Sequence, residues 1–301
     1  MIVLTGATGK LGSLVLKYLL KLTPASNIRV SLHNLSKKQD IEALGVEVVQ
    51  ATYDDKESMV KAFSGADKVF LVSSPSFGIE YRVQSHTRAI EAAIEAGVSR
   101  VYYTSLALKD GTRAPVMQAH LQTEAYLRSQ NKIKYTIIRE GLYTEAYPIW
   151  MGFFKMGDKE VILPGDGPMT WASREDLGEA TAKILADDTF DRDFYYLTNE
   201  ESFTLEDTAK LIGEILKQDV TFRLVSVDEF KQVHVHEPQY ANHWTPVYES
   251  LAKGDCDIRD PTLGQVLGRA PRAHKEVLQQ LAADKDSQNE GERWLKGGKS
   301  Q

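Results

Sequence analysis

Apolar and polar positions along the first 200 residues form two patterns that alternate. Short, nearly continuous apolar runs predict strands that are buried on both faces. These runs lie at 2–4, 28–32, 46–49, 68–72, 99–104 and 134–139. Between them, apolar residues recur at helical spacing and predict amphipathic helices. A chain in which strands and helices alternate in this way is expected to fold as an α/β protein with a doubly wound parallel sheet.

The alternation becomes less regular after Gly141. Helices are expected from Arg174, after a cap at Thr204, and from Asp228, and strands at 194–197 and 221–225. We therefore expect a nucleotide-binding domain at 1–145 and a smaller C-terminal α/β substrate-binding region at 146–281. Within the latter, 170–198 is expected to pack back onto the first domain. Residues 282–301 are polar and predict a flexible tail.

Three glycines directly follow the first predicted strand. Gly6, Gly9 and Gly12 stand at three-residue spacing, and an amphipathic helix begins beside them. This context is typical of a Rossmann-type dinucleotide site: one glycine permits the turn, the next allows a pyrophosphate to approach, and the third lets helix and strand pack closely. The alternative is a tight turn without a ligand. The expected cofactor contacts in this segment are Gly6, Thr8, Gly9, Lys10, Leu11 and Gly12.

The end of the second strand bears on the choice of cofactor. An acidic residue there binds the ribose 2′-hydroxyl of NAD, but no acid occurs between Ile28 and Gln39. His33, Asn34 and Lys38 stand in this segment instead, with Lys37 beside them. This favours NADP(H) and makes NAD less likely. The alternative for the lysines is a solvated helix start.

Two later loops also reach the predicted cofactor edge of the sheet. Asp54 or Asp55 could cap the following helix, and an acid here could also accept a hydrogen bond from an adenine amino group; capping is the safer interpretation. The loop with Ser73 and Ser74 follows the fourth strand, and in a doubly wound sheet it lies beside the ribose and nicotinamide.

Composition narrows the class of protein. The chain has 301 residues and a formal net charge of -6, which does not suggest a nucleic-acid-binding surface. Its one cysteine, Cys256, excludes an internal disulfide and lies between acidic residues, which disfavours a thiolate nucleophile. No apolar stretch is long enough to span a membrane, and no signal peptide is recognisable. We expect a cytoplasmic protein, with a homodimer left open.

One cluster has the residue types of a metal site. His234, His236, Glu237 and His243 lie close together, but their spacing does not present a pair on one helix face and Pro238 interrupts them. A surface loop without metal is the preferred interpretation. The sequence contains no Gly-x-Ser-x-Gly elbow, so hydrolase chemistry has no support.

Several segments together resemble one family. They are Thr5-Gly6-Ala7-Thr8-Gly9-Lys10-Leu11-Gly12, Tyr103-Thr104-Ser105, His120-Leu121-Gln122-Thr123-Glu124, Ile138-Arg139-Glu140-Gly141-Leu142-Tyr143 and Trp171-Ala172-Ser173-Arg174-Glu175-Asp176-Leu177. The chain resembles the NmrA-like atypical short-chain dehydrogenases, in particular the branch of NADPH-dependent quinone oxidoreductases and triphenylmethane reductases. The resemblance extends to about residue 280 and implies that Thr104 and Glu140 lie near the cofactor.

Three departures from the family pattern stand out. His33 replaces an arginine that contacts the 2′-phosphate in many relatives, and Glu140 replaces an asparagine. None of the 13 tyrosines is followed by lysine four residues later, so the acid pair of ordinary short-chain dehydrogenases is absent. Its absence favours an electrophilic acceptor such as a quinone, which needs little proton assistance, over a simple ketone.

The expected catalytic residues are His120, Glu124 and Tyr143. His120 and Glu124 share a helix face, so Glu124 could orient His120 as a proton donor; the alternative is a structural pair at the rim of the cleft. Tyr143 could hydrogen-bond substrate or ribose. A nearby aromatic stretch could stack on a flat substrate or simply pack between domains. The aromatic stretch consists of Tyr147, Trp150, Phe153 and Phe154.

Two functions follow from these observations. The first is an NADPH-dependent oxidoreductase that transfers hydride to a quinone-like or conjugated aromatic substrate. The second is a non-enzymatic NAD(P)-binding redox sensor of the NmrA type, which would bind cofactor without turnover.

Overall fold

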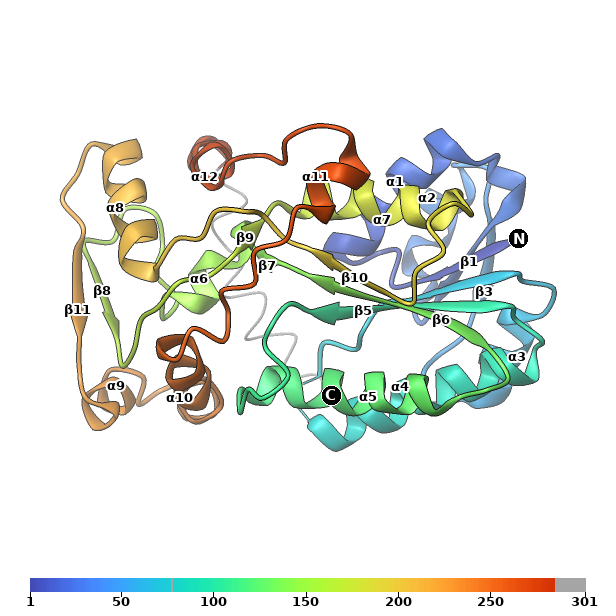
Figure 1. Ribbon diagram of the computed structural model, residues 1–301, viewed down its shortest axis with the longest axis horizontal. Coiled ribbons are helices and arrows are strands. Elements are labelled where there is room, and N and C mark those ends of the chain that lie inside the picture. Colours follow the sequence, from blue (N-terminus) through green and yellow to red (C-terminus); the bar gives the residue numbers. More distant parts are fainter. Residues whose placement is uncertain (77, 285–301) are drawn as a thin grey trace.

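A seven-stranded parallel sheet forms the centre of the molecule in the computed structural model, which describes residues 1–76 and 78–284 (Figure 1). The strand order is β3-β2-β1-β4-β5-β6-β10. The strands are β1 (Ile2–Thr5), β2 (Ile28–Leu32), β3 (Glu47–Gln50), β4 (Lys68–Leu71), β5 (Arg100–Leu106), β6 (Lys134–Glu140) and β10 (Phe194–Leu197). The order reverses between β1 and β4, which is the switch point where such sheets bind ligands. The predicted doubly wound α/β fold is confirmed.

Helices cover both faces of this sheet (Figure 1). One layer contains α1 (Lys10–Leu22), α7 (Arg174–Ala186) and α11 (Thr262–Leu267), and the other contains α3 (Lys56–Phe63), α4 (Ile79–Glu95) and α5 (Pro115–Ser129). Alternate residues of β1 serve the two layers: Ile2 and Leu4 join the core under α1 and α7, and Val3 joins the core under α3 to α5. β1 is thus buried on both faces, which is why it appears as a continuous apolar run.

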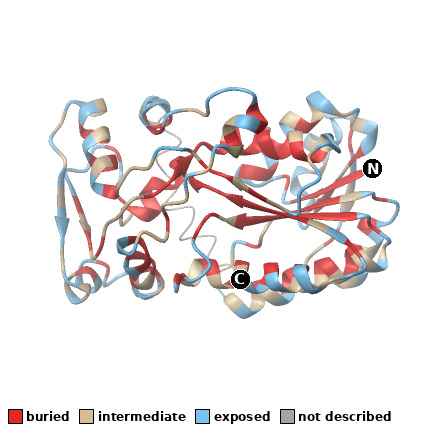
Figure 2. Cartoon of the chain, in the orientation of Figure 1, coloured by how far each residue is buried: buried red, intermediate tan, exposed pale blue. Residues whose placement is uncertain are grey.

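The remaining elements build a smaller region at one end of the molecule, with its own buried core (Figure 2). Its strands β8 (Glu160–Leu163) and β11 (Thr221–Leu224) pair in parallel, as do β7 (Leu142–Tyr143) and β9 (Trp171–Ala172). Its helices are α6 (Tyr147–Trp150), α8 (Leu205–Leu216), α9 (Val227–Val233), α10 (Pro238–Ala252) and α12 (His274–Ala283). Short helical segments complete the chain: η1 (Ala25–Asn27), η2 (Leu35–Lys37), α2 (Lys38–Glu42) and η3 (Thr144–Ala146).

The chain returns from the smaller region to the main sheet through α7 and β10. α7 packs along α1, and β10 pairs with β6 at the edge of the sheet. The tail expected at 282–301 lies outside the described residues except for 282–284, where α12 ends.

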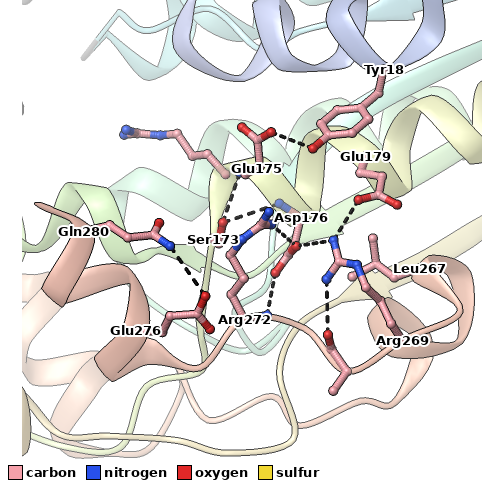
Figure 3. Close-up of polar contacts among 12 residues, drawn as sticks. Tyr18, Ser173, Glu175, Asp176, Glu179, Leu267, Arg269, Arg272, Glu276 and Gln280 are labelled. Carbon is pink, nitrogen blue, oxygen red and sulfur yellow. Dashed lines mark hydrogen bonds and ion pairs between the residues drawn. The ribbon is translucent and has the colours of Figure 1, made fainter. Parts of the chain in front are cut away.

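A buried carboxylate ties the last part of the chain to α7 (Figure 3). Ser173 caps α7 by accepting from the backbone of Glu175 and Asp176. The fully buried Asp176 accepts from Arg269 at 2.8 Å, from the backbone N–H of Arg272 at 2.6 Å, and from the Arg272 guanidinium. These contacts hold the segment before α12 against the nucleotide-binding part.

Replacing this carboxylate tests the connection. We expect Asp176→Ala to lower the free energy of unfolding by about 2–4 kcal/mol, because two arginines and one N–H lose a buried acceptor. Chemical denaturation measures the change. Lys210→Ala is the control, since it removes only an exposed pair with Glu206 and should change stability by less than about 0.5 kcal/mol. Equal effects would show that Asp176 contributes no more than a surface charge.

Candidate functional site

A cavity of about 470 Å³ opens at the carboxyl ends of β1, β2 and β4, beside the glycine turn. Its position at the switch point is the one expected for a nucleotide in this fold. The predicted cofactor residues that line it are Gly6, Thr8, Gly9, His33, Asn34, Asp54, Ser73 and Ser74. A larger hollow of about 680 Å³ lies at the opposite, amino-terminal edge of the sheet, between Met1, Lys68 and Lys134. It is remote from the glycine turn and is not part of this site.

The three glycines have different surroundings. Gly6 adopts φ +64°, a left-handed conformation that favours glycine. A Cβ on Gly12 would stand 2.2 Å from the Gly6 carbonyl oxygen, so Gly12 allows α1 to approach β1. A Cβ on Gly9 would meet only that same oxygen, at 3.2 Å, and would otherwise point into open space. Leu11 lies on the buried face of α1 and, like Lys10 and Gly12, does not line the cavity.

The end of β2 presents a neutral and basic wall to the cavity. His33 is exposed there, and Ser36 and Lys37 line the cavity beside it. Lys38 is instead directed along α2, where its ammonium lies 3.5 Å from Glu42. Lys37 is thus the lysine that lines the cavity, and its ammonium lies 3.2 Å from Asp40.

The two acids after β3, Asp54 and Asp55, each have one of the two expected positions. Asp55 caps α3 by accepting from the Ser58 N–H. Asp54 lines the cavity, where Tyr81 and Arg88 contact its carboxylate at 3.2 Å. Asp54 therefore keeps the position in which an adenine amino group could be bound.

Sequence reasoning missed Tyr53, which lies in the cavity wall. Its hydroxyl donates to the Val72 carbonyl at 2.7 Å and lies 2.7 Å from the Thr5 hydroxyl. It thereby joins the ends of β1 and β4 to the loop after β3. Nothing in the local pattern distinguishes Tyr53 from an ordinary loop aromatic residue, because both partners are distant in sequence.

A buried polar network supports the loop after β4 from the α4–α5 side. The Ser74 N–H donates to His86 Nε2 at 2.9 Å, and His86 Nδ1 lies 2.9 Å from the Thr123 hydroxyl. Thr104 also fixes this loop, by accepting from the Ser73 N–H at 2.9 Å. Thr104 thus positions the cavity wall without lining it.

His120 belongs to the same network, and both of its ring nitrogens contact protein groups. Its Nε2 lies 2.9 Å from Arg82 Nη2, and its Nδ1 lies 2.9 Å from the Tyr103 hydroxyl. Because a guanidinium can only donate, Nε2 accepts and the ring proton is directed to Tyr103. Burial and then the charge of Arg82 lower the pKa of His120 well below its usual value, so the ring is neutral. These contacts favour the structural role over proton donation.

Glu124 does not orient His120. The Arg139 guanidinium donates two hydrogen bonds, of 2.8 and 2.7 Å, to the fully buried carboxylate of Glu124. The carboxylate also accepts a hydrogen bond from the Ser105 hydroxyl at 2.6 Å. Arg128 adds a contact at 3.0 Å. The expected pairing along α5 is therefore corrected: β6 supplies a cation that binds Glu124 more strongly than a neutral imidazole could.

Glu140 and Tyr143 form a pair on the other face of β6. Glu140 is fully buried, and its Oε2 accepts from the Tyr143 hydroxyl at 2.5 Å. Burial raises the pKa of Glu140 to about 8, although the Tyr143 hydrogen bond and Arg174 lower it in part. The Arg174 guanidinium carbon lies 4.8 Å from the centre of the Tyr143 ring. This site therefore holds a neutral carboxyl near pH 7.

The aromatic stretch mainly forms the core of the smaller region. Tyr147, Trp150 and Phe154 are buried, and Trp150 packs edge-on against Trp171 and Trp244. Most of these aromatic residues therefore pack in the core, as the alternative to substrate stacking predicts.

The histidine cluster does not form the expected surface loop. His234 ends α9 and is buried beside Phe230 and Tyr240, and Pro238 begins α10, which contains His243. Within residues 1–76 and 78–284, no group of three or more acidic, histidine or cysteine side chains could hold a metal ion.

In the same part of the chain, no helix is both long and apolar enough to cross a membrane. Burial raises the pKa of the Cys256 thiol.

The sheet order, the glycine turn and the cavity beyond it define a nucleotide-binding protein of the Rossmann type. The chain belongs to the NmrA-like family, whose model matches residues 1–262.

Several relatives extend over most of the chain. Quinone oxidoreductase 2 of Escherichia coli is 34% identical over 233 residues, which are 76% of this chain and 79% of that protein. An NmrA-like family domain-containing oxidoreductase of Aspergillus flavus is 27% identical and covers 93% of this chain and 94% of its own. The structure of Citrobacter triphenylmethane reductase with NADP(H) has a TM-score of 0.83 at 29% identity and covers 93% of this chain and 99% of that one.

The surroundings of the glycines predict two different mutant phenotypes. We expect Gly9→Val to weaken dinucleotide binding at least tenfold while lowering stability by only about 1 kcal/mol, because its side chain enters the space that a phosphate would occupy. Gly12→Ala should instead destabilise the whole fold. Calorimetric titration and chemical denaturation separate the effects. Unchanged binding by Gly9→Val would contradict the proposed place of the phosphates.

Proposed function

We propose that this protein transfers hydride from NADPH to a quinone-like or other conjugated aromatic acceptor. The protein is a reductase, and its cofactor is NADP(H). The observation that carries the proposal is the cavity at the glycine turn, whose β2 wall consists of His33, Asn34, Ser36 and Lys37 and contains no acid. That wall suits a 2′-phosphate better than a free 2′-hydroxyl.

The substrate class rests on relatives and on chemistry. Relatives reduce quinones and triphenylmethane dyes according to their names. Such acceptors take hydride readily, so a site without a tyrosine–lysine pair can serve them. The chain's own residues would bind the cofactor through the glycine turn and α1, and hold the loop after β4 in place through Thr104 and His86.

A turnover assay tests this function. Purified protein with NADPH and a panel of quinones should oxidise NADPH faster than the same mixture without protein, measured by loss of nicotinamide absorbance. NADH should support a lower kcat/KM. Tight NADPH binding without turnover on any quinone would contradict the proposal and favour the non-enzymatic redox sensor.

His33 offers a test of cofactor selectivity. We expect His33→Arg to tighten NADPH binding by about tenfold and NADH binding much less, because a guanidinium adds charge-assisted contacts to a 2′-phosphate. Gln39→Arg is the matched control, since it adds the same charge on α2 at an exposed residue that does not line the cavity. Calorimetry with both cofactors gives the ratio. An equal gain for NADPH and NADH would show that position 33 does not face the 2′-phosphate.

A further inference from the structure

One buried oxygen of Glu140 has no hydrogen-bond partner among residues 1–76 and 78–284. Its Oε2 is bound by Tyr143, whereas Oε1 is enclosed and unpaired among the described residues. An unpaired buried carboxylate oxygen is costly, so its presence at a site requires an explanation. Such atoms are commonly found where a ligand or a proton is handled.

The fold places Glu140 at the edge where the cofactor is expected. Glu140 is the last residue of β6, and it pairs with Leu106 of β5 and Leu197 of β10. The neighbouring Arg139 is directed to α5, so the side chain of Glu140 lies on the opposite face, where α1 and α7 begin. In a doubly wound sheet the cofactor crosses the carboxyl edge from the glycine turn toward β5 and β6.

The groups that face Glu140 do not neutralise it as a carboxylate. Tyr143 from β7 donates to it, and Arg174 from α7 contributes a favourable charge. Arg174 is itself stacked over the Tyr143 ring, and its backbone N–H is bound by Glu145. Burial outweighs these effects and raises the pKa of Glu140 to about 8. The protonated carboxyl can donate to Tyr143, which leaves the phenol proton free to point elsewhere.

We propose that Glu140 and Tyr143 form a proton relay that protonates the reduced substrate, in place of the tyrosine–lysine pair that this chain lacks. The proposal rests on the reductase function above. The acceptor gains hydride, and negative charge develops on its oxygen. The Tyr143 O–H bond breaks as the proton passes to that oxygen, and the carboxyl O–H of Glu140 breaks as its proton replaces the one lost. Glu140 is left as a carboxylate and regains a proton from solvent.

In this relay, the charge of Glu140 also complements the charge of the nicotinamide ring. NADPH has a neutral nicotinamide ring and meets a neutral Glu140, whereas NADP⁺ has a cationic ring and meets a carboxylate. Binding of NADP⁺ should therefore release a proton from Glu140, and binding of NADPH should not. This linkage can be measured without turnover.

The first test is the affinity for both redox forms against pH, by calorimetry. From pH 6 to pH 9 we expect the affinity for NADP⁺ relative to NADPH to rise at least fivefold in the wild-type protein. The 2′-phosphate is common to both forms and cancels in this ratio. Glu140→Gln should make the ratio independent of pH. Glu175→Gln, a control on the same face, should keep the wild-type dependence. A flat wild-type ratio, or a wild-type slope in Glu140→Gln, would overturn the proposal.

The second test is turnover of a quinone against pH. In the wild-type protein kcat should fall as pH rises past the pKa of Glu140, because the proton donor is lost. Glu140→Gln and Tyr143→Phe should each lower kcat about threefold, a modest loss because a quinone accepts hydride readily, with little change in the Kd for NADPH. Glu140→Gln should also remove the pH dependence. Tyr143→Phe should retain the pH-dependent binding ratio, because Glu140 remains.

The two proposals fail in different ways. Wild-type protein that binds NADPH but turns over no quinone would overturn the reductase function and the donor role together. Normal turnover by Glu140→Gln with the wild-type pH profile would overturn the donor role alone.

Discussion

The close approach of α1 to β1 is the constraint on which the rest of the site depends. With a side chain at Gly12, α1 could not begin where it does, because the Cβ would overlap the Gly6 carbonyl. A second close approach fixes the next helix: a Cβ on Gly178 of α7 would stand 2.6 Å from the Leu14 Cβ of α1. Two glycines therefore bring α1 and α7 into one tight layer. The N-termini of both helices consequently lie at the carboxyl edge of the sheet, where α1 begins without a side-chain cap and α7 is capped by Ser173.

The two faces of β6 bury acidic side chains in different surroundings. On the α5 side, Arg139 and Glu124 are both buried and satisfy each other, and this pair anchors α5 to the sheet. On the α1–α7 side, Arg174 offsets the burial of Glu140 only in part, and one Glu140 oxygen is unpaired within the described part of the chain. A carboxyl with a raised pKa contributes less to stability as pH rises through that pKa, because folding then requires a bound proton. Burial of Glu140 therefore lowers the stability of the protein at its cofactor edge. On the α5 side, the pairing of Arg139 with Glu124 avoids such a cost.

Most of the fold could be predicted from local patterns, because continuous apolar runs and helical periodicity are properties of neighbouring residues. The glycine turn could be predicted for the same reason, since strand, turn and helix follow one another in the chain. The contacts of Glu124 could not, because a helical neighbour such as His120 is visible in the sequence whereas Arg139 reaches it only through the sheet. Tyr53 was missed on the same grounds, and Lys38 was chosen over Lys37 because the direction of η2 is not a property of composition.

The departure of Glu140 from the family pattern was visible in the sequence, but its consequence was not. Read alone, an acid near the nicotinamide adds negative charge close to the acceptor oxygen, on which negative charge also develops during reduction. The structure changes this argument, because burial raises the pKa of Glu140 to about 8 and its carboxyl is hydrogen-bonded to Tyr143. In the proposed relay, Glu140 is neutral before hydride transfer and negative after it, when the cofactor ring is positive. A single buried acid can thus follow the charge of the reaction.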